Sequence, residues 1–366
     1  MDHRWSSGFR GAAGGGRAGF MLFVCLLYCL CFRSAVGQAT VAVVQSGGSS
    51  HRPPPPVCAS SPRQGVIDST LYHPGDAACL MKSIKKYSYQ EFLKDRPMAA
   101  TVLRLSFHDC MTKGGGCDAS IFKPGEIRDP DDINEGVRIT VPVITRIRQR
   151  AAKECGVYPT MADTIARAGA AAIAFSGLAD PTTAGFLLGR RDIADNQTGD
   201  DPKTLPNAVE AFDVILRKLT GLGLSLREVT VFSLGGHSVG KSACSHFKLR
   251  LNNGSTPGGC RKPVDPTLDP AFACKLAKLC RDPDADVSFD FGTPFSLDNK
   301  YFKLLLKHQA LLRIDQAFAT HSGTARFVRE YAKRPKRFAR DFLKAFVQVE
   351  LMNINGPTTA PPKYYY

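Results

Sequence analysis

The sequence of 366 residues lacks the features of several large classes of protein. It has no zinc-ligand spacing, no basic-aromatic module and no long block of Lys and Arg, so nucleic-acid binding is not predicted despite a net charge of +15. No repeat occurs at solenoid periods, and the apolar-polar alternation of strands is scarce. Beyond the N-terminal region, no segment is apolar enough to cross a membrane. These absences leave a mainly α protein.

The positive charge is spread along the chain rather than concentrated in one block. A diffuse positive field favours adhesion to an acidic polysaccharide or to a membrane surface. We therefore expect an acidic polysaccharide or a membrane surface among the partners, and no nucleic acid.

The N-terminal residues predict secretion. Three arginines precede an apolar run at residues 18–32, and small residues follow it at 34–37. This pattern predicts a signal peptide of residues 1–37. An uncleaved anchor is the weaker alternative, because the run is shorter than the roughly 20 residues of a membrane span.

Composition divides the rest of the chain into three parts. Residues 38–69 are rich in Pro, Gly and Ser and predict a disordered linker, with polyproline II at Pro53–Pro56. Residues 70–355 predict one folded domain, and residues 356–366 a disordered tail.

Nine cysteines remain after the signal peptide: Cys58, Cys79, Cys110, Cys117, Cys155, Cys244, Cys260, Cys274 and Cys280. In an oxidising secretory route they indicate disulfides with one thiol left over. Glycosylation sequons at Asn196 and Asn253 agree with secretion.

Helix starts are indicated by capping pairs and prolines. Pro335 is expected to separate two C-terminal helices within residues 324–352. Capping signals occur at Thr160 with Asp163, Asn207 with Glu210, and Ser225 with Glu228.

The densest set of reactive side chains lies between Arg104 and Ser120. Pro97 predicts the start of a helix that runs into this stretch. Arg104 and His108 are four residues apart, so they lie on one face of that helix. The pair predicts acid/base chemistry over a reactive centre.

A metal loop is predicted directly after this pair. Asp109 points away from the Arg104–His108 face, and Cys110 and Cys117 bracket a glycine-rich loop that returns to Asp118 and Ser120. Carboxylate and hydroxyl oxygens suit a hard cation.

A second histidine, His237, follows Gly235 and Gly236 at a predicted helix end. A histidine there is commonly structural, because an imidazolium suits the negative end of the helix dipole. The two glycines instead leave room for a large planar group. Asp315 is available to accept the second N–H of the ring, as a ligating histidine requires.

Five motifs then occur in order, and together they resemble the plant secretory (class III) haem peroxidases over residues 75–352. They are Arg104-Leu-Ser-Phe107-His108-Asp109-Cys110, Gly116-Cys117-Asp118-Ala119-Ser120, Leu188-Gly189-Arg190-Arg191-Asp192, Leu234-Gly235-Gly236-His237-Ser238 and Asp298-Asn299-Lys300-Tyr301-Phe302. The resemblance implies a monomer with the mainly α haem-peroxidase fold, in which two helical domains sandwich one haem b.

The resemblance also implies a role for each central residue. His237 would be the iron ligand, with Asp315 accepting its N–H. His108 would move the proton of hydrogen peroxide, and Arg104 would stabilise the developing charge. Asn134 would orient His108.

Three further residues would shape the site. Phe107 and Phe289 would contact the haem, and the carbonyl of Pro206 would bind the reducing substrate. The implied enzyme reduces hydrogen peroxide and oxidises phenolic donors by one-electron steps. Its implied location is extracellular, in the cell wall, with the vacuole as an alternative.

Two calcium ions are implied as well. The distal set would be Asp109, Thr112, Gly116, Asp118 and Ser120, and the proximal set Ser238, Asp290, Thr293, Ser296 and Asp298. Six residues separate Cys110 from Cys117, against the family's usual four, which puts the role of Thr112 in question.

The implied disulfides are Cys79–Cys155, Cys110–Cys117 and Cys244–Cys280, with Cys260–Cys274 as an extra pair. Cys58 would be free or intermolecular. Met161 stands where the family has a cysteine, and no cysteine follows Cys280 to pair with it. Ser106 replaces a common histidine and should face away from the haem.

Two alternatives remain. Intracellular relatives, such as ascorbate peroxidases, carry a proximal tryptophan, whereas this chain has Phe289 there and its one tryptophan, Trp5, lies in the signal. A non-catalytic haem-binding protein is the second alternative, although Arg104, His108 and Asp315 are all retained.

Overall fold

The computed structural model describes residues 68–112, 116–124, 126, 133–207, 210–251 and 263–352. The predicted signal peptide, the linker up to residue 67, Cys58, Cys260 and the C-terminal tail lie outside these residues. Within them, no helix is long and apolar enough to span a membrane.

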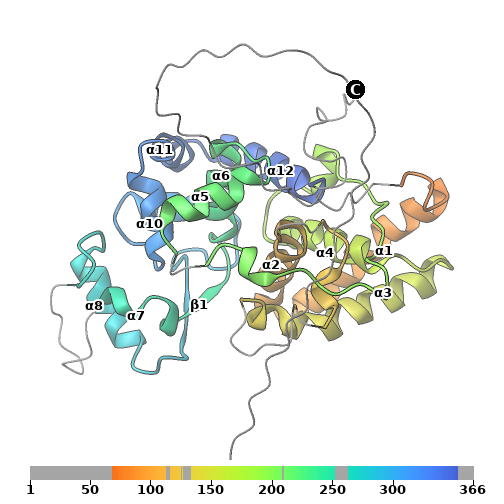
Figure 1. Ribbon diagram of the computed structural model, residues 1–366, viewed down its shortest axis with the longest axis horizontal. Helices are drawn as coiled ribbons and strands as arrows, with labels where there is room; N and C mark the ends of the chain where they lie inside the picture. Colours follow the sequence, from red (N-terminus) through yellow and green to blue (C-terminus); the bar gives the residue numbers. More distant parts are fainter. Residues whose placement is uncertain are drawn as a thin grey trace, which may run out of the picture. The chain divides into compact units, whose positions relative to one another are not determined.

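The mainly α prediction is confirmed (Figure 1). The α-helices are α1 (Pro74–Lys94), α2 (Pro97–Met111), α3 (Val141–Cys155), α4 (Met161–Phe175), α5 (Phe212–Gly221), α6 (Leu226–Gly236), α7 (Lys248–Leu251), α8 (Pro270–Leu279), α9 (Lys300–Leu305), α10 (Arg313–Thr320), α11 (Ala325–Lys333) and α12 (Pro335–Glu350). Five 3-10 helices are η1 (Ser120–Phe122), η2 (Glu135–Thr140), η3 (Pro181–Ala184), η4 (Pro202–Thr204) and η5 (Cys244–His246). Strands β1 (Lys241–Ala243) and β2 (Asp286–Ser288) pair antiparallel, with Lys241 opposite Ser288.

Helices α1 to α4 pack together around the alanine-rich α4 (Figure 1). Small side chains let α2 and α4 approach closely, since a Cβ added at Gly169 would lie 2.4 Å from Oγ of Ser106. Ser106 is therefore buried against α4. A site on the side of α2 that faces away from α4 would lie on another face of the helix.

A second group of helices surrounds α6, which contacts α5, α9, α11 and α12. A Cβ added at Gly235 would lie 2.5 Å from the Phe342 ring of α12. A Cβ added at Gly236 would meet nothing within 4 Å. The two glycines thus differ in role: Gly235 permits close contact between α6 and α12, and only Gly236 borders open space.

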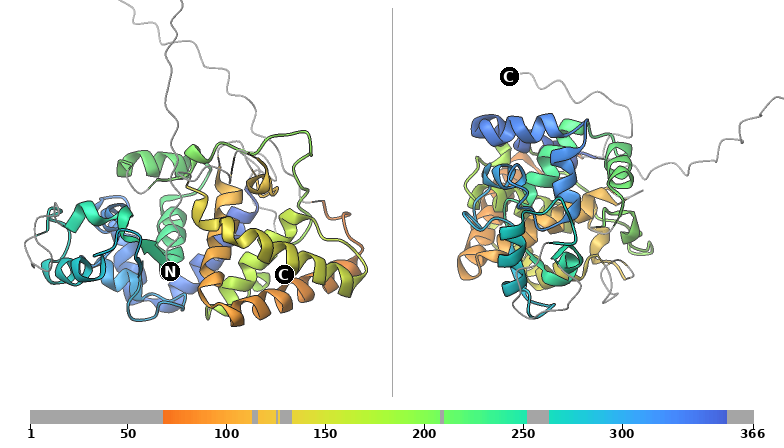
Figure 2. Two further views of the ribbon diagram at one scale, coloured as in Figure 1. Left: turned by 90° about the horizontal axis from the view of Figure 1, so that it is seen from below. Right: turned by 90° about the vertical axis from the view of Figure 1, so that its left-hand side faces the viewer.

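Helix α12 also contacts α2, so the last helix of the described residues joins both groups (Figure 2). The break at Pro335 is confirmed, because α11 ends at Lys333 and α12 begins at Pro335.

Two capping predictions are confirmed and one is wrong. Ser225 and Glu228 form a reciprocal capping box at α6, and the Thr160 side chain caps α4. Helix α5 instead begins at Phe212 without a side-chain cap. The Glu210 carboxylate binds the Asn207 amide at 3.0 Å and Lys218 Nζ at 2.6 Å, so it closes a turn before the helix.

Three disulfides have both cysteines among the described residues: Cys79–Cys155 between α1 and α3, Cys110–Cys117 at the end of α2, and Cys244–Cys280. They are the three main pairs that the resemblance implies. Cys274 is also disulfide-bonded, and its expected partner Cys260 lies outside the described residues.

Candidate active site

Helix α2 presents Arg104 and His108 one turn apart. Nε of Arg104 donates to Nε2 of His108 at 3.1 Å, and Nδ1 of His108 lies 2.5 Å from Oδ1 of Asn134. The Asn134 amide is itself fixed, because its Nδ2 donates to the Glu126 carbonyl at 2.7 Å. The amide oxygen can only accept, so His108 carries its proton on Nδ1 and leaves Nε2 as the basic atom.

The electrostatics keep His108 neutral. Burial, and to a smaller extent the Arg104 charge, lower the pKa of His108 to about 3, against the opposing Asn134 hydrogen bond. Arg104 has solvent-accessible surface, yet protein surrounds its guanidinium closely enough to lower its pKa by desolvation. Nη2 of Arg104 donates to the Ile133 carbonyl at 2.9 Å. The pair is thus a neutral proton acceptor beside a fixed cation.

His237 lies at the C-terminal end of α6. Its Nδ1 is 2.9 Å from Oδ2 of Asp315, a buried residue of α10, and its ring stacks on Phe289 with centroids 4.4 Å apart. Tyr301 donates to the same Asp315 oxygen at 2.6 Å. The His237 side chain remains 34% exposed, so Nε2 is the ring nitrogen left for a ligand.

Tyr301 is a site residue that the sequence analysis did not assign. It lies within the Asp298–Phe302 motif, which was the available signal. Burial and the Asp315 charge raise the pKa of Tyr301 well above its usual value, so its hydroxyl stays a donor.

The two histidines lie on helices that touch. The Phe107 ring is 5.7 Å from that of Phe232 on α6, and 5.3 Å from the His108 ring. These residues fit a haem, because His237 offers one ring nitrogen while a carboxylate holds the other, as in ligating histidines. Open space at Gly236 and the neutral His108 agree with this fit.

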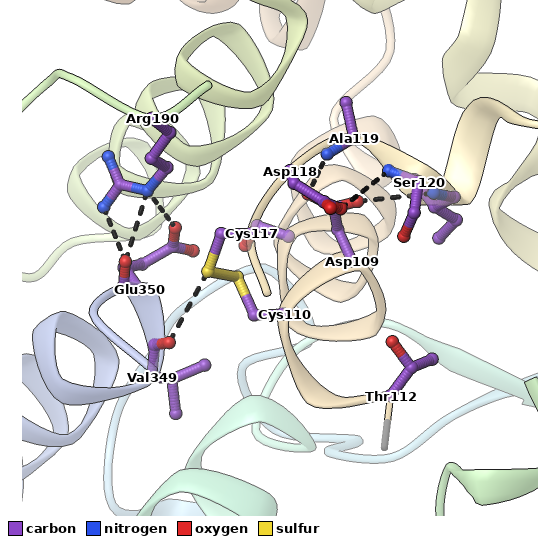
Figure 3. The surroundings of a disulfide bond; sticks show 12 residues. Asp109, Cys110, Thr112, Cys117, Asp118, Ala119, Ser120, Arg190, Val349 and Glu350 are labelled. Atoms are coloured by element: carbon purple, nitrogen blue, oxygen red, sulfur yellow. Dashed lines mark hydrogen bonds and ion pairs between the residues drawn. A yellow bond between two sulfur atoms is a disulfide. The ribbon is translucent and has the colours of Figure 1, made fainter. Parts of the chain in front are cut away.

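Several carboxylates lie near the C-terminal end of α2 (Figure 3). The Asp109 carboxylate accepts the amides of Ala119 and Ile121 at 3.1 and 3.4 Å. Burial, with the charges of Asp118 and Glu126, raises the pKa of Asp109 well above its usual value. Such repulsion between buried acids fits a bound cation that would replace the protons.

Two buried oxygens beside these acids lack partners within the described residues, Oγ of Ser120 and Oε1 of Glu126. Burial raises the pKa of Glu126 to about 8, although the Asp200 amide donates to its Oε2 at 2.7 Å. Glu126 was not singled out from the sequence, where no motif marks it. The Ser120 hydroxyl and the raised pKa of Glu126 are consistent with a cation bound by oxygen ligands at this place.

The remaining distal calcium candidates are Thr112 and Gly116. Oγ1 of Thr112 donates to Oδ2 of Asp200 at 2.9 Å. Figure 3 shows Thr112 apart from Asp118 and Ser120, so its side chain is not gathered with that group. Gly116 is buried immediately before the Cys117 disulfide.

On the proximal side, Thr293 joins two carboxylates. Its Oγ1 lies 3.1 Å from Oδ2 of Asp290 and 2.8 Å from Oδ2 of Asp298. The Ser296 amide binds the Thr293 carbonyl at 3.0 Å, which places it in the same loop. Ser238 is buried, with its hydroxyl on the Gly235 carbonyl at 2.7 Å.

Pro206 lies half-buried between η4 and α5. Among the described contacts, none joins it to Arg104 or His108. The structure therefore brings the two histidine pairs together without linking them to the expected donor site.

The chain was compared with known proteins. A family model for peroxidases matches residues 82–334. Peroxidase 72 of Arabidopsis thaliana is 33% identical over 266 residues, which cover 70% of this chain and 76% of that protein. Peroxidase 64 of the same plant is 29% identical over 269 residues, covering 72% and 81%. Cationic peroxidase SPC4 of Sorghum bicolor is 30% identical over 275 residues, covering 73% and 72%. The chain therefore belongs to the peroxidase family, in its plant class III branch of haem enzymes that reduce hydrogen peroxide while oxidising a donor.

Proposed function

We propose that this peroxidase is an extracellular monomer that holds one haem b and two calcium ions and oxidises phenolic donors in one-electron steps. The observation that carries the proposal is the pairing of Arg104–His108 on α2 with His237–Asp315 on α6 and α10. The predicted signal peptide and the disulfides support the extracellular location.

Haem, when bound, supplies the iron centre at which the peroxide O–O bond is reduced. His237 would hold it through Nε2, and Asp315 and Tyr301 would fix the ring through Nδ1. Phe289, stacked on His237, would keep that ring in one plane.

Nε2 of His108 would take a proton from hydrogen peroxide and return it to the departing oxygen. The low pKa of His108 keeps Nε2 unprotonated at physiological pH. Arg104, already directed at Nε2, would stabilise negative charge on the departing oxygen. Asn134 would preserve the required tautomer by accepting from Nδ1.

The distal calcium ion would bind at Asp109, Gly116, Asp118 and Ser120, with Thr112 contributing its backbone oxygen. The proximal ion would bind at Ser238, Asp290, Thr293, Ser296 and Asp298. Because Asp109 follows His108 and Ser238 follows His237, each ion would brace the segment that carries one histidine. Pro206 would receive the donor.

The test uses the protein purified with haem and calcium. His108→Ala should keep the haem absorption band and lower peroxide turnover of a phenolic dye by about 10²–10⁴-fold. His237→Ala should disturb the haem band itself. A wild-type haem band without dye turnover would favour the non-catalytic haem-binding alternative. Equal loss of band and turnover in both variants would contradict the assigned roles.

A further inference from the structure

The corner where α11 meets α12 is strongly basic. Residues 325–344 contain eight Lys and Arg against two acidic residues, Glu330 and Asp341. Seven of the eight cations are exposed and the eighth, Arg337, is partly exposed. We call these eight residues the basic corner: Arg326, Arg329, Lys333, Arg334, Lys336, Arg337, Arg340 and Lys344.

The two acids of this segment are already neutralised. Arg227 of α6 reaches Glu330 at 2.9 Å and Asp341 at 3.3 Å. Arg337 reaches Asp341 at 2.7 Å and Glu330 at 3.8 Å. Two carboxylates thus sit in the angle between α11 and α12, each bound by the same two guanidinium groups.

Further arginines crowd the same two acids. Arg334 lies 3.8 Å from Glu330, and Arg340 lies 3.4 Å from Asp341. Their side chains are 71% and 54% exposed, so most of the five N–H donors of each guanidinium face solvent. Four guanidinium groups around two carboxylates leave a net positive charge with unused donors.

The remaining cations increase this excess. Within the part of the chain that the structure describes, the other five have no ion pair: Arg326, Arg329, Lys333, Lys336 and Lys344. Lys336 and Lys344 lie on one face of α12, a turn to either side of Arg340. Residues four apart on a helix are neighbours at about 5–6 Å, so this row repeats positive charge at regular intervals.

From this geometry we propose that the basic corner docks a linear polysaccharide bearing carboxylates on successive sugars. The proposal rests on the extracellular location proposed above. Carboxylates that repeat along a polysaccharide can pair with the row of cations on α12, and each can accept two parallel hydrogen bonds from an arginine guanidinium.

Two other polyanions fit less well. A membrane-binding helix buries an apolar face, yet none of the exposed large apolar residues of the described chain lies between 325 and 344. Single-stranded nucleic acid needs exposed aromatic rings for stacking. The aromatic residues of this segment are all buried: Phe327, Tyr331, Phe338 and Phe342.

The test measures binding of the haem-loaded full chain to immobilised polygalacturonate at moderate salt. The docking variant replaces four cations of the basic corner by glutamine and leaves Arg227 and Arg337 in place: Lys333, Arg334, Lys336 and Arg340. The control variant makes the same charge change at exposed lysines on α1, α3, α7 and α8 that form no ion pair with any described residue: Lys82, Lys153, Lys248 and Lys278.

The docking variant should bind about tenfold more weakly than wild type, or ~1.4 kcal/mol, while the control variant loses less than twofold. Equal losses in the two variants would show that net charge alone drives binding and overturn the proposal. Stronger binding of wild type to phosphatidylserine vesicles than to polygalacturonate would overturn it as well. Peroxidase turnover, measured in parallel, should be unchanged in both variants. If wild type and both variants all lack turnover, the proposed function is contradicted, while the comparison of their binding to polygalacturonate still tests the docking proposal.

Discussion

Glu350, the last residue of α12, gives the sharpest test of the physical reasoning. It is fully buried beside the Cys110–Cys117 disulfide, and neither carboxylate oxygen has a hydrogen-bond partner among the described residues (Figure 3). Its one close counter-charge is Arg190, whose Nε lies 3.6 Å from Oε2. Arg190 is shared, because it also binds Asp163 at 3.2 Å.

The size of the effect follows from the pKa. Burial raises the pKa of Glu350 from 4.5 to about 7, against the attraction of Arg190. Between about pH 4.5 and pH 7, the Glu350 carboxyl therefore holds a proton in the folded state that it has already lost in the unfolded chain. The resulting stability is fully present below about pH 4.5 and is lost as the pH rises through 7. A shift of this size corresponds to at most ~3 kcal/mol.

The perturbation is Glu350→Gln, which keeps the volume and removes the titration. Guanidinium unfolding between pH 5 and pH 8, with calcium held constant, should give similar free energies for both proteins at pH 5. At pH 8 the variant should be more stable by about 1–3 kcal/mol. Asp195→Asn, at a fully exposed carboxylate, is the matched control and should follow wild type throughout. A Glu350→Gln curve parallel to wild type, or a less stable variant at pH 8, would refute the reasoning.

Three further outcomes are expected. Tyr301→Phe removes one of the two side-chain hydrogen bonds described for buried Asp315, and should lower the free energy of unfolding by ~1 kcal/mol and shift the haem spectrum. An unchanged spectrum would show that Tyr301 does not act in the site. Asn134→Leu frees the His108 tautomer and should lower peroxide reactivity at least tenfold without loss of haem, which stopped-flow absorbance can check. Calcium affinity should rise with pH, because burial and the neighbouring acids raise the pKa of Asp109 and calcium must displace its proton; a pH-independent titration would contradict this.

Local patterns explain why part of the site was predictable. Arg104 and His108 lie on one helix, so their spacing alone predicted that they share a face, and the structure joins them at 3.1 Å. His237 and Asp315 are 78 residues apart, and no periodicity links positions so distant. That pair depends on how α10 approaches the end of α6, and the sequence suggested Asp315 only because a ligating histidine needs an acceptor for its second N–H.

Contacts between helices explain the features that the sequence left open and those that the sequence analysis misinterpreted. The bulk removed at Gly235 makes room for Phe342 of α12, a neighbour that local sequence does not reveal. Glu350 carries a charge near a helix end, where a solvated side chain is the usual expectation. Its burial follows from α12 packing against α2 and could not be read from its own surroundings in the chain.

The contacts of α12 also bear on the order of assembly during synthesis. This helix touches both α2, which carries His108, and α6, which ends at His237, and it is completed only at residue 350 of 366. A chain still emerging from the ribosome therefore lacks α12, the helix that contacts both α2 and α6. Because domains fold as units once their residues are available, catalytic competence should appear only after α12 has been synthesised. A truncated chain that ends before Pro335 would then be released without an assembled centre, and so without the capacity to generate radicals inside the cell.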